Sequence, residues 1–293
     1  MRKTTAPAML NIGKGLMTLS ARNHTFKLGI AVSLICLLIC IIASIKVVPV
    51  YPSMAEEITR RPDSIFQILT GQFLDTQLLA VHWSIFAMVL FSMVSIVFVH
   101  YFFEKTLSPE ILYVVLFAAS FSIEALRLIL PLSRVYDIPS LNMLMVSRII
   151  LFCRYFGIFS LFTASVYAVG FEAQKQLNVL IVITVVTLII TLGVPIDNDA
   201  WDSGMNMITG YVPMFRLIEI GTFFITTMSF FIAAWLRGSR EFAFIGTGSV
   251  LVFLGRHILL HADAWAALPA GLLFLAAGTW LICTRLHKIY LWL

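Results

Sequence analysis

Residues 177–193 read LNVLIVITVVTLIITLG, a run without one charged side chain. A helix of about 20 such residues, rising about 1.5 Å per residue, crosses a hydrocarbon core roughly 30 Å thick. Similar apolar runs recur along nearly the whole chain of 293 residues, of which 60% are hydrophobic and 12% charged. The sequence therefore predicts an all-α, polytopic membrane protein with no separate soluble domain.

Polar breaks divide the chain into eight apolar segments, each long enough to form a transmembrane helix. We predict spans near residues 28–48, 79–102, 109–131, 144–170, 177–195, 214–236, 243–261 and 265–285. The segment 243–261 is the weakest of them, because the charged sequence RHILLH ends it. The expected organisation is a leader (1–27), one transmembrane bundle (28–285) and a short tail (286–293).

The distribution of lysine and arginine predicts the orientation, because these residues are enriched in cytoplasmic loops. With the N-terminus inside, the basic residues on the outer side are Lys46, Arg60, Arg61 and Arg134. Those on the inner side are Arg2, Lys3, Lys14, Arg22, Lys27, Lys105, Lys175, Arg237, Arg240, Arg285 and Lys288. This predicts a multi-pass protein of the cell inner membrane with both termini inside and an uncleaved first helix. The same loops account for the net charge of +5, so nucleic-acid binding is not expected.

The two largest loops, 50–78 and 196–213, both face outward in this arrangement. The first has helix-capping residue types at Ser53 and Asp63, which predict two short interfacial helices. The second places Asp197, Asp199 and Asp202 close together but lacks the glycine and glutamate spacing of a calcium loop. We expect a solvated acidic loop there.

Ionisable residues inside the spans gather at one depth. An ionisable side chain in a span costs a few kcal/mol, so it normally faces the bundle interior and serves a function. Because successive spans alternate in direction, all ten of the following fall on the outer side: His82, Glu124, Arg127, Arg148, Arg154, Arg216, Glu219, Arg256, His257 and His261. The inner halves are apolar, with His100 and Glu104 near the boundary as the main exceptions.

Helical spacing pairs some of these charges and leaves others without a partner. Glu124 with Arg127, and Arg216 with Glu219, can neutralise each other within one helix. The three remaining arginines, Arg148, Arg154 and Arg256, have no acidic partner within a span, and guanidinium groups bind phosphate or carboxylate. We therefore predict an outward-facing pocket for an anionic, lipidic or glycolipidic group, bound by Glu124, Arg127, Arg148, Arg154, Arg216, Glu219 and Arg256.

Two simpler interpretations remain open for these residues. Arg148, His261 and His82 lie close enough to the interface to reach lipid headgroups without any ligand. The whole polar set is also compatible with a structural network that holds the helices together.

The stretch GRHILLHADAW (255–265) adds a candidate catalytic pair. His257 and His261 are four residues apart and therefore share one helix face. Imidazole titrates near neutral pH, so the pair can act as general acid and base on a bound anionic substrate. If the histidines transfer no proton, the same residues form the ligand-binding pocket of a receptor or binding protein.

The histidine pair also allows a metal site. HxxxH near the end of a seventh span, together with His82, resembles the intramembrane zinc hydrolases of the ceramidase and adiponectin-receptor superfamily. The resemblance implies zinc held by His82, His257 and His261. This chain departs from the pattern because no serine stands four residues before His82, and because nearby arginines would repel a cation.

Other functions have weaker support in the sequence. His82 and His257 are the candidate axial ligands for a haem, but haem carriers normally stack two such pairs. A transporter would need polar access from both sides, and a membrane sensor would need a protein partner because the cytoplasmic loops are short. The sequence assigns no cofactor. The partners it indicates are the lipid bilayer and an anionic lipid or small molecule.

Overall fold

The computed structural model describes residues 19–51, 78–104, 106, 108–202, 204–262 and 264–291. Within these ranges, eight helices are long and apolar enough to cross a membrane, which confirms the predicted all-α bundle. The α-helices are α1 (Leu19–Val47), α4 (Leu78–Phe103), α5 (Pro109–Ser120), α6 (Ile129–Tyr136), α7 (Ser140–Val169), α8 (Gln176–Gly193), α9 (Val212–Leu236), α10 (Arg240–Leu260) and α11 (Ala267–Leu291). The weakest predicted span forms the continuous helix α10. The interfacial helices expected within 50–78 lie outside the described residues.

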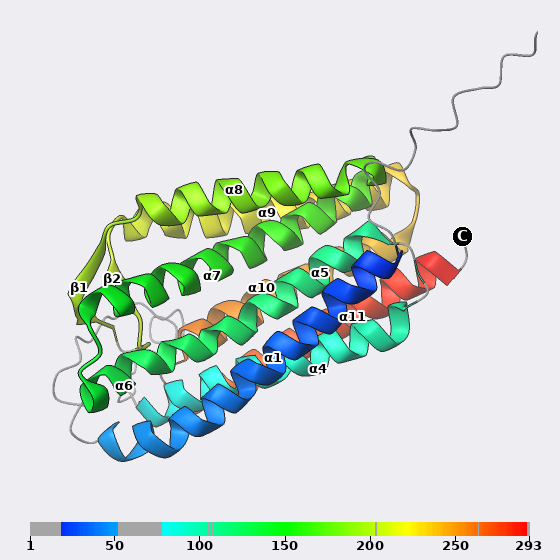
Figure 1. Cartoon of the computed structure of the whole chain (residues 1–293). Coiled ribbons are helices and arrows are strands. Elements are labelled where there is room, and N and C mark those ends of the chain that lie inside the picture. Colours follow the sequence, from blue (N-terminus) through cyan, green and yellow to red (C-terminus); the bar gives the residue numbers. More distant parts are fainter. Residues whose placement is uncertain are drawn as a thin grey trace, which may run out of the picture.

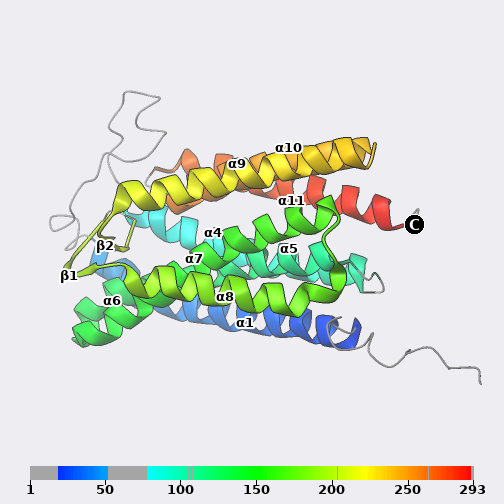
Figure 2. The same cartoon turned by 90° about the horizontal axis from the view of Figure 1, so that it is seen from above.

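The helices form one elongated bundle (Figures 1 and 2). Helices α1, α4, α11, α10, α9 and α7 contact one another in that order, and α5 lies against α1, α4 and α7. The third span, which contains α5, is the most buried of the eight. Helix α8 is the least buried and packs against α7.

The two ends of the bundle differ. At one end β1 (Ile196–Trp201) and β2 (Met207–Thr209) form an antiparallel hairpin, whereas α1 begins and α11 ends at the other (Figure 1). We call these the hairpin end and the opposite end. The hairpin replaces the solvated loop predicted for 196–213, and the prediction missed it because the strands are short. The Asp-Ser-Gly sequence at 202–204 has the turn-forming residue types that connect such strands.

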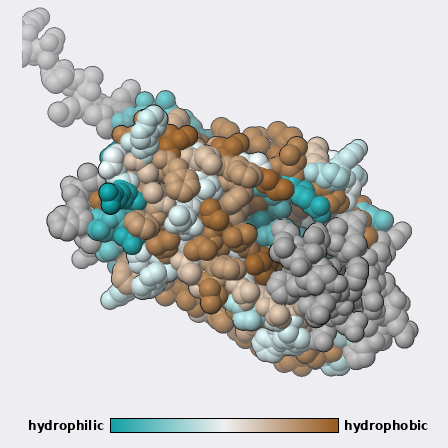
Figure 3. All heavy atoms as spheres, turned by 180° about the vertical axis from the view of Figure 1, so that it is seen from behind, coloured by the Kyte–Doolittle hydropathy of each residue, from teal (hydrophilic) through white to brown (hydrophobic). Residues whose placement is uncertain are grey.

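The surface matches a membrane-spanning bundle. On the face seen in Figure 3, hydrophobic side chains cover the middle of the molecule and hydrophilic side chains gather toward its two ends. This is the distribution expected when lipid tails surround the middle of the bundle and water or headgroups surround its ends.

Glycines bring α10 and α11 into close contact. A Cβ atom added to Gly255 would lie 2.5 Å from the backbone nitrogen of Leu275, and one added to Gly278 would lie 2.7 Å from the carbonyl oxygen of Gly248. Small residues allow this approach between helices, which in lipid associate largely by close packing. The packing fixes the position of Arg256, the residue after Gly255.

The third span is not the single α-helix that its sequence predicts. Between α5 and α6 lies the 3₁₀ helix η2 (Phe121–Leu128), eight residues long. Runs of 3₁₀ helix beyond about four residues are uncommon and often mark functional segments. Because side chains three positions apart lie above one another in a 3₁₀ helix, η2 places Glu124 and Arg127 on one face.

Candidate functional site

Glu124 of η2 holds two arginines at the hairpin end. Arg154 of α7 donates from Nε to Oε1 and from Nη2 to Oε2, each at 2.6 Å. Arg127 places Nη1 3.4 Å from Oε2, which confirms the predicted pairing within the third span. Glu124 and Arg127 are only 2% and 1% exposed. Bidentate pairing of this kind offsets part of the cost of burying the charges.

The tip of the hairpin completes this network. Arg154 Nη2 donates to Asn206 Oδ1 at 2.7 Å, and Arg127 donates to the carbonyl oxygen of Gly204. Asp202 accepts hydrogen bonds from the backbone nitrogen of Asn206 at 2.8 Å and from its Nδ2 at 3.2 Å. The hairpin is therefore attached to the two arginines bound by Glu124.

A second ion pair joins α10 to α9 and α7. Arg256 Nη1 lies 3.2 Å from Glu219 Oε1, and Arg256 Nη2 donates to the carbonyl oxygen of Arg154 at 3.4 Å. The prediction that Arg154 and Arg256 lack acidic partners within spans is therefore wrong. Both partners lie on other helices, where sequence spacing gives no indication of contact.

The histidine pair lies beside this ion pair. The rings of His257 and His261 are 4.5 Å apart, and Nδ1 of His261 lies 3.0 Å from the carbonyl oxygen of His257. Because a carbonyl oxygen only accepts, that Nδ1 must carry the proton, so the neutral ring has its lone pair on Nε2. Nε2 of His257 is buried and has no hydrogen-bond partner among the described residues.

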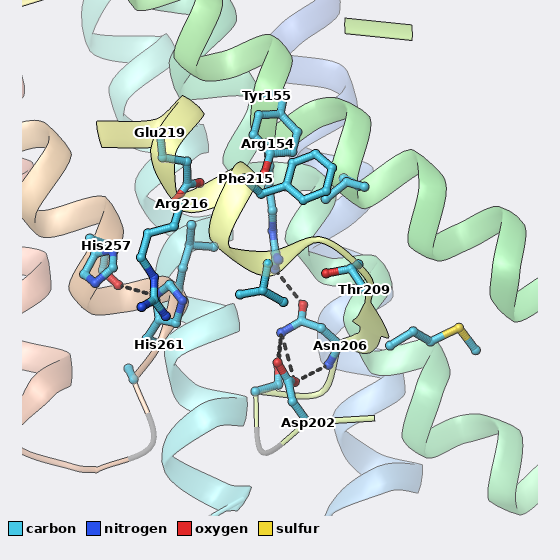
Figure 4. A pocket seen from close by; sticks show the side chains of 16 residues that line it. Arg154, Tyr155, Asp202, Asn206, Thr209, Phe215, Arg216, Glu219, His257 and His261 are labelled. Atoms are coloured by element: carbon cyan, nitrogen blue, oxygen red, sulfur yellow. Dashed lines mark hydrogen bonds between the residues drawn. The ribbon is translucent and has the colours of Figure 1, made fainter. Parts of the chain in front are cut away.

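These groups surround a cavity of about 200 Å³ (Figure 4). The hairpin, α7, α9, α10 and the residue that follows α10 provide its polar lining, which consists of Arg154, Asp202, Asn206, Thr209, Arg216, Glu219, His257 and His261. The Arg216 side chain extends away from Glu219 toward the two histidines (Figure 4). Glu124, Arg127 and Arg256 form a second layer, bonded to residues of the lining.

Arg148 is separate from this group. Its Nη1 donates to the carbonyl oxygens of Thr191 and Leu192, at 2.8 and 2.9 Å, at the end of α8. The last carbonyls of a helix have no partner within the helix and attract cations. Arg148 therefore fastens α8 to α7, and the structure does not bring it to the cavity.

His82 is also separate from the histidine pair. Its Nε2 lies 2.8 Å from Ser44 Oγ and its Nδ1 lies 2.7 Å from Tyr51 Oη, so both ring nitrogens have partners. Over the described part of the chain, no three His, Cys, Asp or Glu side chains are grouped closely enough to hold a metal ion. The three-histidine set implied by the zinc-hydrolase resemblance is not assembled.

Several lining residues were missing from the predicted site. Tyr155 and Phe215 contribute aromatic walls, and their rings lie 5.5 Å apart. Asn206 and Thr209 come from the hairpin. Tyr155 could have been predicted as a lining residue, because it follows Arg154 in the sequence. Asn206 and Thr209 could not, because the sequence does not show that the hairpin folds back over the end of the bundle.

No match to this chain was found among protein-family models, curated proteins or solved structures. What the cavity binds is therefore inferred from its own geometry and charge.

Proposed function

We propose that this multi-pass membrane protein binds an anionic group, a phosphate or a carboxylate carried by a lipid-like ligand, in the cavity at its hairpin end. The observation that carries the proposal is the enclosure of a cavity by arginines and histidines within a bundle of apolar helices. Charged residues at such depth are costly, and they mark a functional site by default.

The charge balance of the cavity and its second layer favours an anion. Their described residues include four guanidinium groups, Arg127, Arg154, Arg216 and Arg256, and three carboxylates, Glu124, Asp202 and Glu219. One positive charge is in excess before the histidines are considered. Because Glu124 holds Arg154 in a fixed position, a ligand in the cavity would meet a guanidinium group that is already oriented.

Basic residues support an outward-facing hairpin end. Five arginines inside the spans are set aside: Arg127, Arg148, Arg154, Arg216 and Arg256. The other described basic residues at the opposite end are Arg22, Lys27, Lys175, Arg237, Arg240, Arg285 and Lys288, whereas Lys46 and Arg134 lie in α1 and α6 toward the hairpin end. Basic residues concentrate on the cytoplasmic side of membrane proteins. In this orientation the ligand enters the cavity from the outer leaflet of the membrane or from the aqueous space outside the membrane.

The test is the binding of glycerol 3-phosphate to the purified protein in detergent, measured by calorimetry. Arg216→Gln removes a cavity guanidinium and should weaken binding at least about tenfold, since a charged hydrogen bond contributes roughly 1.5–3 kcal/mol. Arg148→Gln is the matched control, because Arg148 lies near the same end but bonds to α8. Equal affinities for the two variants would refute the proposal.

A second candidate function is hydrolysis of a phosphate ester, and the hydrogen bond between His261 and the carbonyl of His257 favours it. That bond orients His261 with its basic Nε2 free of the backbone. In this function His261 Nε2 takes a proton from a water molecule as the water oxygen bonds to phosphorus and the P–O bond to the alcohol breaks. The protonated His261 then gives that proton to the departing alkoxide.

Release of inorganic phosphate from lysophosphatidic acid tests this second candidate. We expect measurable release by the wild-type protein and none by His261→Ala, at equal protein levels. His257→Ala should also abolish release. No release by the wild-type protein, or unchanged release by His261→Ala, would exclude catalysis on this substrate class.

A further inference from the structure

An apolar groove lies farther from the hairpin end than the cavity, toward the middle of the bundle. Its lining includes Phe159 and Phe162 of α7, Val182 and Val186 of α8, and Thr222 and Ile225 of α9, and its volume is about 230 Å³. Helix α7 forms the floor of the groove, because both α8 and α9 pack against α7. The lining contains no charged side chain.

The groove follows the cavity along two shared helices, α7 and α9. On α7 the cavity residues Leu151 and Tyr155 are followed by Phe159 and Phe162, at intervals of four, four and three, which is one face of a helix. On α9 the cavity residue Glu219 is followed by Thr222 and Ile225, at intervals of three. Between Tyr155 and Phe159 the helix rises only about 6 Å.

A comparison with another apolar groove shows why this continuity is informative. A second groove, of about 420 Å³, lies between α4 and α11 and is lined by residues such as Trp83 and Leu272. Neither α4 nor α11 contributes a residue to the cavity lining. Of these two grooves, only the one on α7, α8 and α9 shares helices with the charged cavity, namely α7 and α9.

We infer that the ligand is an amphiphile whose anionic head occupies the cavity while one acyl chain lies in the groove between α7, α8 and α9. The inference rests on the proposed function, because it needs a head group in the cavity to place the chain. The order of the two sites along α7 and α9 matches such a molecule, with charge near the hairpin end and hydrocarbon toward the middle of the bundle. It also gives a role to α8, which is attached to α7 and leaves much of its surface exposed.

The test fills the groove without changing the cavity. Val186 lines the groove and is 42% exposed, so Val186→Trp should place an indole in the path of the chain without disturbing the core. Val185→Trp is the matched control, because Val185 is 47% exposed on the same helix and is not among the groove residues. The probes are glycerol 3-phosphate, which has the head alone, and 1-palmitoyl lysophosphatidic acid, which has the same head and one chain.

We expect Val186→Trp to weaken binding of the lysolipid about tenfold, which corresponds to 1.4 kcal/mol, and to leave glycerol 3-phosphate binding unchanged. Val185→Trp should change neither affinity. If Val186→Trp leaves lysolipid binding unchanged, or weakens both probes equally, the chain site is wrong while the head site stands. If neither probe binds the wild-type protein, the proposed function itself is wrong.

Discussion

Charged side chains form polar contacts at both ends of the bundle, but they are arranged differently. At the opposite end, Arg22 donates to the carbonyl oxygens of Phe103 and Glu104 at the end of α4, and Glu241 pairs with Arg285 and Lys288. Those contacts join helix ends to one another. At the hairpin end, the charged side chains of several helices surround a cavity. Charged contacts thus fasten helix ends at the opposite end and form a candidate binding site at the hairpin end.

Glu110 is a buried carboxylate at the opposite end, and its contacts also join helix ends. It is 2% exposed at the start of α5 and accepts hydrogen bonds from Ser108 Oγ at 2.7 Å and from Tyr290 Oη at 2.6 Å. The prediction named His100 and Glu104 as the main polar exceptions at this end and overlooked Glu110. Its contacts connect the first turn of α5 to the last turn of α11.

The largest expected difference between the two ends is in stability. Glu124→Gln leaves two arginines without their carboxylate in a buried site, which should cost about 3–5 kcal/mol. Glu241→Gln removes a carboxylate from partly exposed pairs and should cost about 1 kcal/mol or less. Thermal unfolding in detergent measures both variants. An equal loss of stability in Glu124→Gln and Glu241→Gln would contradict the expected difference in strength between the two ion-pair networks.

The glycine contact between α10 and α11 gives the next largest effect. Gly255→Ala places a Cβ atom against the backbone of α11 and should destabilise the protein by about 2 kcal/mol, as overpacking does. Gly221→Ala on α9 is the control, because a Cβ atom there meets nothing within 4 Å. Thermal unfolding should separate the two variants. If both behave like the wild-type protein, α10 is not held in place by this contact.

A smaller effect is expected at the hairpin tip. Asn206→Ala removes an acceptor from Arg154 and should cost about 1–2 kcal/mol. Thr184→Ala removes a hydroxyl whose hydrogen bond stays within α8 and should change stability by less than about 0.5 kcal/mol. Hydrogen exchange of the hairpin amides should rise only in Asn206→Ala. Unchanged exchange there would mean that Arg154 does not fasten the hairpin.

Much of the architecture could be predicted because each span is a local property of the sequence. Eight apolar runs of sufficient length predict eight helices. Their alternating direction was enough to gather Arg154, Arg216, Glu219, Arg256 and His257 toward one end. The predicted pair Glu124 and Arg127 is three residues apart and is confirmed at 3.4 Å.

The contacts between helices could not be predicted in the same way. Arg154 and Glu124 are 30 residues apart, and Arg256 and Glu219 are 37 apart, so helical periodicity gives no indication of either pair. Arg148 has the same side chain as Arg154 and lies six positions earlier on α7, yet it bonds to the end of α8. Only the packing of the helices decides which arginine reaches the cavity.

Native mass spectrometry of the protein, purified in a mild detergent without added ligand, tests the central claim most directly. The claim predicts that the wild-type protein retains an anionic amphiphile with an acyl chain, and that Arg216→Gln loses it while Arg148→Gln retains it. If the wild-type protein carries no such molecule, or if all three proteins carry the same amount, the cavity is not a binding site for an anionic amphiphile.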